Sequence, residues 1–158
     1  MFLVKRIACL YVLLILITSC ATLPTQSEMR QQIASYELPA KPKDGYAIVY
    51  IVRPSSYGAF VSFEIYIGKK DADNEVGSTT GSEHIYFNLS PGTHKIISKA
   101  ENATEVELQV EADKVYFLEQ IPTTGILIAR NELKVIDEIT GKYHMKNTRP
   151  GKVTDKEF

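Results

Sequence analysis

The sequence predicts an all-β fold: a single β-sandwich of about seven short, mainly antiparallel strands, with a short helix allowed at either end. Residues 45–52 are almost entirely apolar, as in a central strand that is covered on both faces. Residues 61–67 and 105–111 alternate apolar and polar side chains, which indicates one buried and one solvated face. Turn signals separate these runs at short intervals, as is typical of sandwiches and barrels.

The N-terminal elements follow from capping and proline signals. A capping box at Thr25–Glu28 is followed by apolar residues at helical spacing, so a short helix is expected over about 26–37. Residues 20–44 as a whole are polar and contain several prolines, which predicts a tether ahead of the folded domain. The central strand ends at Arg53–Pro54, because proline cannot donate to a strand ladder.

The later strands are bounded by turns. A polar loop at 68–74 leads to a short edge strand at 75–77, and Pro91–Gly92 suit the centre of a type II turn. A hairpin at that turn would pair Leu89 with His94. The remaining predicted strands are 84–89, 94–99, 105–111, 115–118 and 125–130.

The C-terminal part has two interpretations. The last strand can extend to Ile136, yet the apolar residues from Leu133 to Tyr143 also fit a helical stripe that Gly141 weakens. The sandwich domain is therefore placed at 45–146. Residues 147–158 are polar and lack periodicity, which predicts a flexible tail.

The first nineteen residues predict a secretory signal peptide. Lys5 and Arg6 precede an apolar run over residues 7–17. This run is too short to remain as an anchor, because a helix that spans a bilayer needs about 20 apolar residues. One interpretation of the segment is an ordinary signal peptide in which Cys20 follows the apolar run by chance.

The stretch Ile17-Thr18-Ser19-Cys20 resembles a bacterial lipobox. The resemblance implies cleavage between Ser19 and Cys20 and attachment of acyl chains, diacylglycerol and palmitate, to Cys20. Ala21, where an aspartate would favour the inner membrane, is compatible with sorting to the outer membrane. The implied location is the bacterial cell envelope, lipid-anchored at the outer membrane and facing the periplasm.

Cysteine content and charge agree with that location. Cys9 would leave with the signal peptide and Cys20 would be acylated, so the mature chain forms no disulfide. Loss of Lys5 and Arg6 changes 18 basic and 19 acidic residues to 16 and 19, a net charge of −3. No basic block predicts nucleic-acid binding.

Six segments, in order, resemble a bacterial lipoprotein family of unknown function with a small sandwich like that of PEGA-type surface domains. The segments are 45–54, 65–68, 76–77, 89–94, 114–118 and 135–141. The resemblance covers residues 40–146 and implies a fold and a location, but no catalytic residue. The loop Lys69–Asn74 is longer than the tight turn expected at that place.

The sequence predicts no metal, no cofactor and no enzymatic activity. His84 and His94 flank the predicted turn, but there is no third ligand at zinc spacing. The segment Asp71–Glu75 begins like a calcium loop, yet Val76 and Ser82 replace the required glycine and glutamate, which leaves only a weak adventitious site open. The mature chain would have no free cysteine thiol, and the sequence has no Gly-x-Ser-x-Gly elbow for nucleophilic catalysis.

Four residues are candidate ligand contacts: Arg53, Tyr66, Tyr86 and Asn88. Tyrosine is common at binding surfaces, and it is also an ordinary strand residue. Arg53, which precedes Pro54, is placed either to bind an anion or to cap a loop. The function predicted is an interaction module that binds an envelope protein, and the alternative is binding of a glycan or peptidoglycan through the tyrosines and Asn88.

Overall fold

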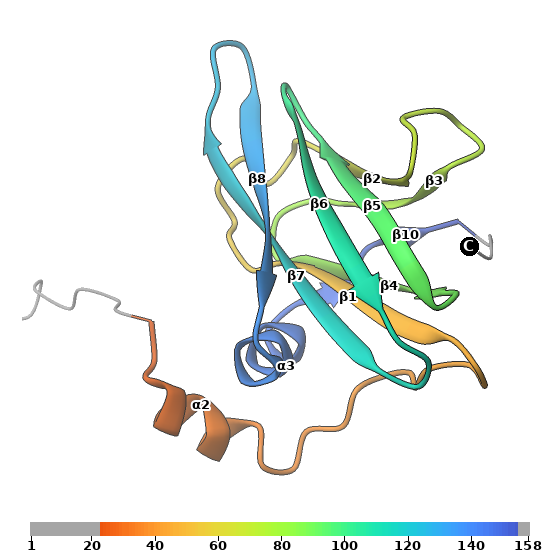
Figure 1. Cartoon of the computed structure of the whole chain (residues 1–158). Coiled ribbons are helices and arrows are strands. Elements are labelled where there is room, and N and C mark those ends of the chain that lie inside the picture. The colour runs from red at the N-terminus through yellow and green to blue at the C-terminus, as the bar shows by residue number, and fades with distance from the viewer. Residues whose placement is uncertain (1–22, 155–158) are drawn as a thin grey trace, which may run out of the picture.

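The computed structural model describes residues 23–154, whose strands form two stacked five-stranded sheets (Figure 1). The first sheet has the order β8 (Ala129–Ile136), β7 (Val115–Thr124), β1 (Ala47–Arg53), β4 (Glu83–Leu89) and β9 (Arg149–Pro150). The second has the order β10 (Lys152–Val153), β3 (Glu75–Thr79), β2 (Phe63–Ile67), β5 (Gly92–Lys99) and β6 (Ala103–Val110). The two helices described are α2 (Gln26–Gln32) and α3 (Glu138–Lys146). The predicted all-β sandwich is confirmed, although it has more strands than expected.

Strand β1 lies at the centre of the first sheet and is buried along its whole length. It pairs antiparallel with β4 and parallel with β7. Val49 and Ile51 point into the space between the sheets, whereas Ile48 and Tyr50 point to the outer face. The prediction of a central strand covered on both faces is therefore confirmed.

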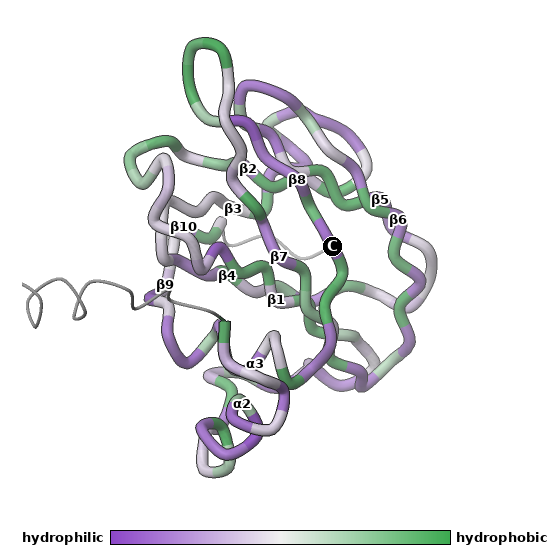
Figure 2. Tube along the Cα trace, turned by 90° about the vertical axis from the view of Figure 1, so that its left-hand side faces the viewer, coloured by the Kyte–Doolittle hydropathy of each residue, from purple (hydrophilic) through white to green (hydrophobic). Residues whose placement is uncertain are grey.

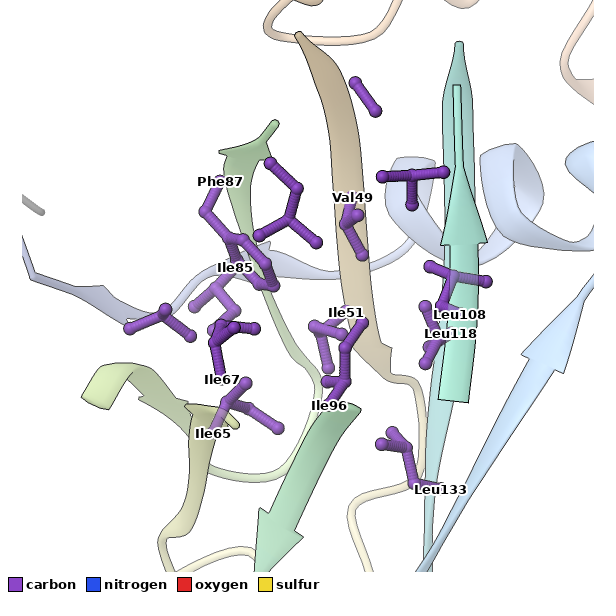
Figure 3. Close-up of a cluster of buried hydrophobic side chains, with 14 residues drawn as sticks. Val49, Ile51, Ile65, Ile67, Ile85, Phe87, Ile96, Leu108, Leu118 and Leu133 are labelled. Carbon is purple, nitrogen blue, oxygen red and sulfur yellow. The ribbon is translucent and has the colours of Figure 1, made fainter. Parts of the chain in front are cut away.

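The main core fills the space between the two sheets (Figure 3). Val49 and Ile51 of the first sheet meet Ile65 and Ile96 of the second, and these side chains are buried completely. Burial of an aliphatic side chain of this size stabilises the fold by about 1.5–3 kcal/mol. The alternation in the sequence is thus explained by one face of each strand that enters this core.

The turn at Pro91–Gly92 connects the two sheets, and the expected hairpin is absent. Leu89 pairs with Ala47 of β1, and His94 pairs with Leu108 of β6. The expected pairing of Leu89 with His94 is wrong. The Pro91–Gly92 signal predicts that the chain turns, but contacts with distant segments determine which strand lies beside β4 and which beside β5. His84 and His94 consequently lie in different sheets.

The N-terminal segment packs on the outer face of the first sheet. Thr25 and Glu28 form the predicted capping box, and α2 lies against α3. Residues 36–43, the N-terminal strap, then cross the sheet: the Tyr50 hydroxyl donates to the Ala40 carbonyl at 2.7 Å. Most of the segment expected to be a tether is therefore part of the folded unit, because apolar strap residues cover the outer face of β1.

The C-terminal part combines both interpretations of its sequence. Strand β8 runs to Ile136, and Asp137 then caps α3 through the amides of Ile139 and Thr140. Residues 125–128 form a loop where a strand was expected, because the amides of residues 126–128 donate to the Glu101 carboxylate and not to a neighbouring strand. The expected flexible tail instead contributes β9, beside Glu83 and His84, and β10, beside Gly77 and Ser78.

Within residues 23–154, no helix is long and apolar enough to cross a membrane. The predicted signal peptide at 1–19, the cleavage site at Ser19 and the lipid attachment site at Cys20 lie outside the described residues.

Candidate interaction site at the loop end of the sandwich

Large apolar side chains are exposed at one end of the sandwich. Five of the nine exposed large hydrophobic residues between 23 and 154 belong to two neighbouring loops. We define them as the loop-end patch: Tyr57, Phe60, Ile126, Leu127 and Ile128. The tip of the β7–β8 hairpin projects beyond the sheets as an apolar segment, at the opposite end from α2 and α3 (Figure 2). Exposed apolar side chains that gather at one end of a fold commonly mark an interaction site.

Glu101 holds the β7–β8 loop in place. Its carboxylate accepts hydrogen bonds from the backbone amides of Ile126 at 3.0 Å, Leu127 at 2.9 Å and Ile128 at 2.8 Å. These three bonds lower the pKa of Glu101 below its ordinary value, with Ile128 the largest contributor. The amides point inward, and the side chains of Ile126 and Leu127 are left 87% and 89% exposed.

Arg53 holds the second loop, residues 54–62. Its guanidinium donates to the carbonyls of Val61 at 2.7 Å, Gly58 at 2.8 Å and Tyr57 at 3.0 Å. The guanidinium carbon lies 3.6 Å from the centre of the Phe63 ring. Burial lowers the pKa of Arg53 to about 10, which leaves the side chain charged at neutral pH. Arg53 thus orders the loop that presents Phe60, and its Nε is buried without a hydrogen-bond partner.

The two loops contact each other at their bases. The hydroxyl groups of Tyr57 and Thr124 lie 3.3 Å apart. Gly58 has a φ of +62° and approaches Ala129 so closely that a Cβ at position 58 would lie 2.9 Å from the Ala129 Cβ. Two charged side chains and this contact therefore hold the loop-end patch in one conformation before any partner binds.

A layer of buried polar side chains lies beneath the patch. Gln120 accepts from the Thr79 hydroxyl at 2.5 Å and donates to the Ser98 hydroxyl at 2.8 Å. Asn131 accepts from Thr104 at 3.0 Å, which connects β8 to β6. The Arg53 guanidinium reaches this layer through the Thr79 carbonyl at 3.4 Å. Because the Gln120 and Asn131 side chains are hydrogen-bonded to neighbouring strands, the layer fixes the register of the strands that carry the loops.

The four candidate contacts predicted from the sequence are not brought together. Arg53 is buried beneath the patch. Tyr66 is buried on β2, contrary to the solvated face expected for the residues that alternate with Ile65 and Ile67, and its hydroxyl donates to the Glu64 carboxylate at 2.6 Å. Asn88 accepts from the Lys43 amide of the strap at 3.1 Å. Tyr86 lines a crevice beside β9.

Sequence reasoning did not identify the loop-end patch. Ile126, Leu127 and Ile128 follow one another without polar alternation, which fits a buried strand as well as an exposed loop. A signal was present in Gly125, which precedes the three residues at a point where turns are common. Nothing in the sequence indicates that Glu101, more than twenty positions earlier, binds their amides.

The histidines and the acidic loop have local partners. His84 Nδ1 lies 2.9 Å from the Thr148 hydroxyl, and His94 Nε2 lies 2.7 Å from the Ser90 carbonyl oxygen. The Asp71 carboxylate accepts from the Asn74 amide at 3.1 Å. Between residues 23 and 154, no three His, Cys, Asp or Glu side chains are placed to hold a metal ion.

Replacing Glu101 by alanine is expected to speed amide hydrogen exchange at Ile126, Leu127 and Ile128, because their common acceptor is lost. The same amides of the unmodified protein should lose protection as the pH falls below the ordinary glutamate value of 4.5, when the carboxylate takes up a proton. Exchange measured by NMR tests both statements. Glu107→Ala, at an exposed position of β6, is the control, and equal exchange in all three proteins would contradict the role of Glu101.

Comparisons with known proteins identify a family for the sandwich. The family model described as a protein of unknown function (DUF2846) matches residues 43–131. The matched region contains both loops of the loop-end patch together with Arg53 and Glu101. No curated protein matches the chain.

Proposed function

The chain belongs to this family of proteins of unknown function, and on that premise we propose that it is a lipid-anchored lipoprotein of the bacterial cell envelope. Its PEGA-like sandwich acts as an interaction module, and the loop-end patch binds an apolar surface of another envelope protein. The observation that carries the proposal is the patch itself, whose apolar side chains are exposed on loops ordered by Arg53 and Glu101. A surface ordered before binding loses little entropy when a partner docks.

The position of the patch supports a partner in the periplasm. If Cys20 carries the acyl chains, residues 21–24 are the chain between the anchor and the capping residue Thr25. Four residues span at most roughly 14 Å when extended. The α2 and α3 end of the molecule is then held near the membrane, and the loop-end patch at the opposite end faces away from it (Figure 1).

Photo-cross-linking in intact cells tests the binding site. With a benzoylphenylalanine at position 127 or 60 of the full chain, we expect a covalent adduct of defined mass with one envelope protein. Val135 is the matched control position, because it is apolar and exposed on β8 but lies outside the patch. Adducts of equal yield at position 135, or none at positions 127 and 60, would contradict the proposal. Adducts with peptidoglycan fragments alone would instead support the glycan-binding alternative.

Replacing Cys20 by alanine tests the anchor. Without the acylated thiol, the protein is expected to move from the membrane fraction to the soluble periplasmic fraction, since nothing described in the fold replaces the acyl chains. Cell fractionation followed by immunoblotting measures this change. Cys9→Ala, within the predicted signal peptide, should leave the distribution unchanged. A Cys20→Ala protein that stays with the membranes would refute the lipid anchor.

A further inference from the structure

The outer edge of β4 is a second candidate binding surface. We propose that it accepts an extended peptide segment of a partner protein as an added strand. Strand β4 pairs with β1 from Glu83 to Leu89. On its other side β9 pairs with it only at Glu83 and His84. The edge from Ile85 to Leu89 therefore has no ladder partner among residues 23–154.

The backbone of this edge determines what kind of ligand fits. The carbonyls of Ser82 and His84 accept from the amides of Arg149 and Gly151, at 3.1 and 2.7 Å, so the backbone groups of these two residues face away from β1. Backbone groups alternate in direction along a strand, so those of Tyr86 and Asn88 also face outward. Amides and carbonyls with this spacing are complementary to another extended backbone, which is how strand addition binds peptides.

The β4 edge differs from the other strand edges in its lack of charge. Exposed edges are commonly protected from pairing by charged side chains. Strand β6 carries Glu105 and Glu107, and β8 carries Arg130, Glu132 and Lys134. Residues 84–89 of β4 include no Asp, Glu, Lys or Arg. The absence of this protection leaves the edge competent to pair with another chain.

A crevice beside the edge sets the chemistry of the peptide. It has a volume of about 370 Å³ and lies where β9 stops, so an added strand would continue along the same side of β4. Pro39, Tyr86, Pro150 and Val153 line it, together with His84. Burial lowers the pKa of His84, which keeps the imidazole neutral at pH 7. An uncharged crevice of this kind suits a peptide with an apolar side chain at alternate positions.

Hydrogen exchange tests the proposal on the full chain purified in detergent. The probe is a short synthetic peptide of alternating valine and threonine. At about ten times its Kd, the amides of Tyr86 and Asn88 should exchange about tenfold more slowly, because only the unbound fraction exchanges. The Phe87 amide, which faces β1, should not change. The same peptide with N-methyl groups on every residue has no backbone N–H donor on either edge and should give no protection.

A pair of variants separates the backbone from the side chain. Asn88→Ala and Asn88→Pro both lose the contact with the Lys43 amide, but only the proline removes the outward N–H. The alanine variant should bind the peptide and the proline variant should not. Absence of binding, equal binding by both variants, or protection at Ile126–Ile128 instead would overturn the proposal. Because the loop-end patch is not involved, such a result would leave the proposed function standing.

Discussion

Replacing Arg53 by methionine is expected to lower the free energy of unfolding by about 3 kcal/mol, since a buried acceptor left without a donor costs about 1–3 kcal/mol. Methionine keeps an apolar stem that can still contact the Phe63 ring. It cannot donate to the carbonyls of Val61, Gly58 and Tyr57, although the Gly58 carbonyl keeps the Val61 amide as a second donor. Part of this loss is offset because methionine has no charge to desolvate, and burial already lowers the pKa of Arg53.

The same change should release the loop that presents Phe60. Denaturant unfolding gives the stability, and hydrogen exchange over residues 54–62 gives the local order. Arg130→Met, at an exposed position of β8, is the matched control and should change stability by no more than about 0.5 kcal/mol. Arg53→Lys keeps the charge but has one nitrogen where the guanidinium uses two, so it should restore only part of the stability. A methionine variant as stable as the unmodified protein would refute the role of Arg53.

The fold was predictable where the signal is local. Residues 45–52 indicated a strand buried on both faces because both β1 faces meet apolar layers, the main core on one side and α3 with the strap on the other. The capping box at Thr25 needs only four consecutive residues. By contrast, the partners of β4 and β5 depend on contacts between distant segments, which no turn signal at Pro91 encodes.

The candidate site was less accessible to sequence reasoning, for a physical reason. Arg53 could be singled out because a charged residue ends a buried strand, but its three nearest carbonyl partners lie in a loop without a recognisable motif. Glu101 is similar, because three amides of a distant loop determine its role. The orientation of Ile126 and Leu127 toward solvent depends on these long-range bonds, whereas an apolar run by itself predicts burial.

Gly141 illustrates a residue whose role is visible only in the packed structure. Glycine in a helix costs about 1 kcal/mol relative to alanine, and for that reason it weakened the predicted helix. In the structure, α3 lies so close to β7 that a Cβ at position 141 would be 2.2 Å from Cγ of Phe117. The Phe117 ring cannot easily move away, because it is buried and stacks on Tyr50 at 5.3 Å between ring centres. Contact between helix and sheet therefore outweighs helix propensity at this position.

Gly141→Ala is accordingly expected to destabilise the protein by about 2 kcal/mol, since overpacking of a tight core typically costs 1–3 kcal/mol. Lys142→Ala is the control on the same helix: it loses the ion pair with Glu138, which is worth about 0.5 kcal/mol or less. Denaturant unfolding of both variants measures the difference. Phe117→Leu makes room for the new methyl group. Gly141→Ala should therefore lower the free energy of unfolding less in the Phe117→Leu background than in the unmodified protein. If Gly141→Ala instead raised stability, helix propensity would dominate and the close approach of α3 to β7 would be refuted.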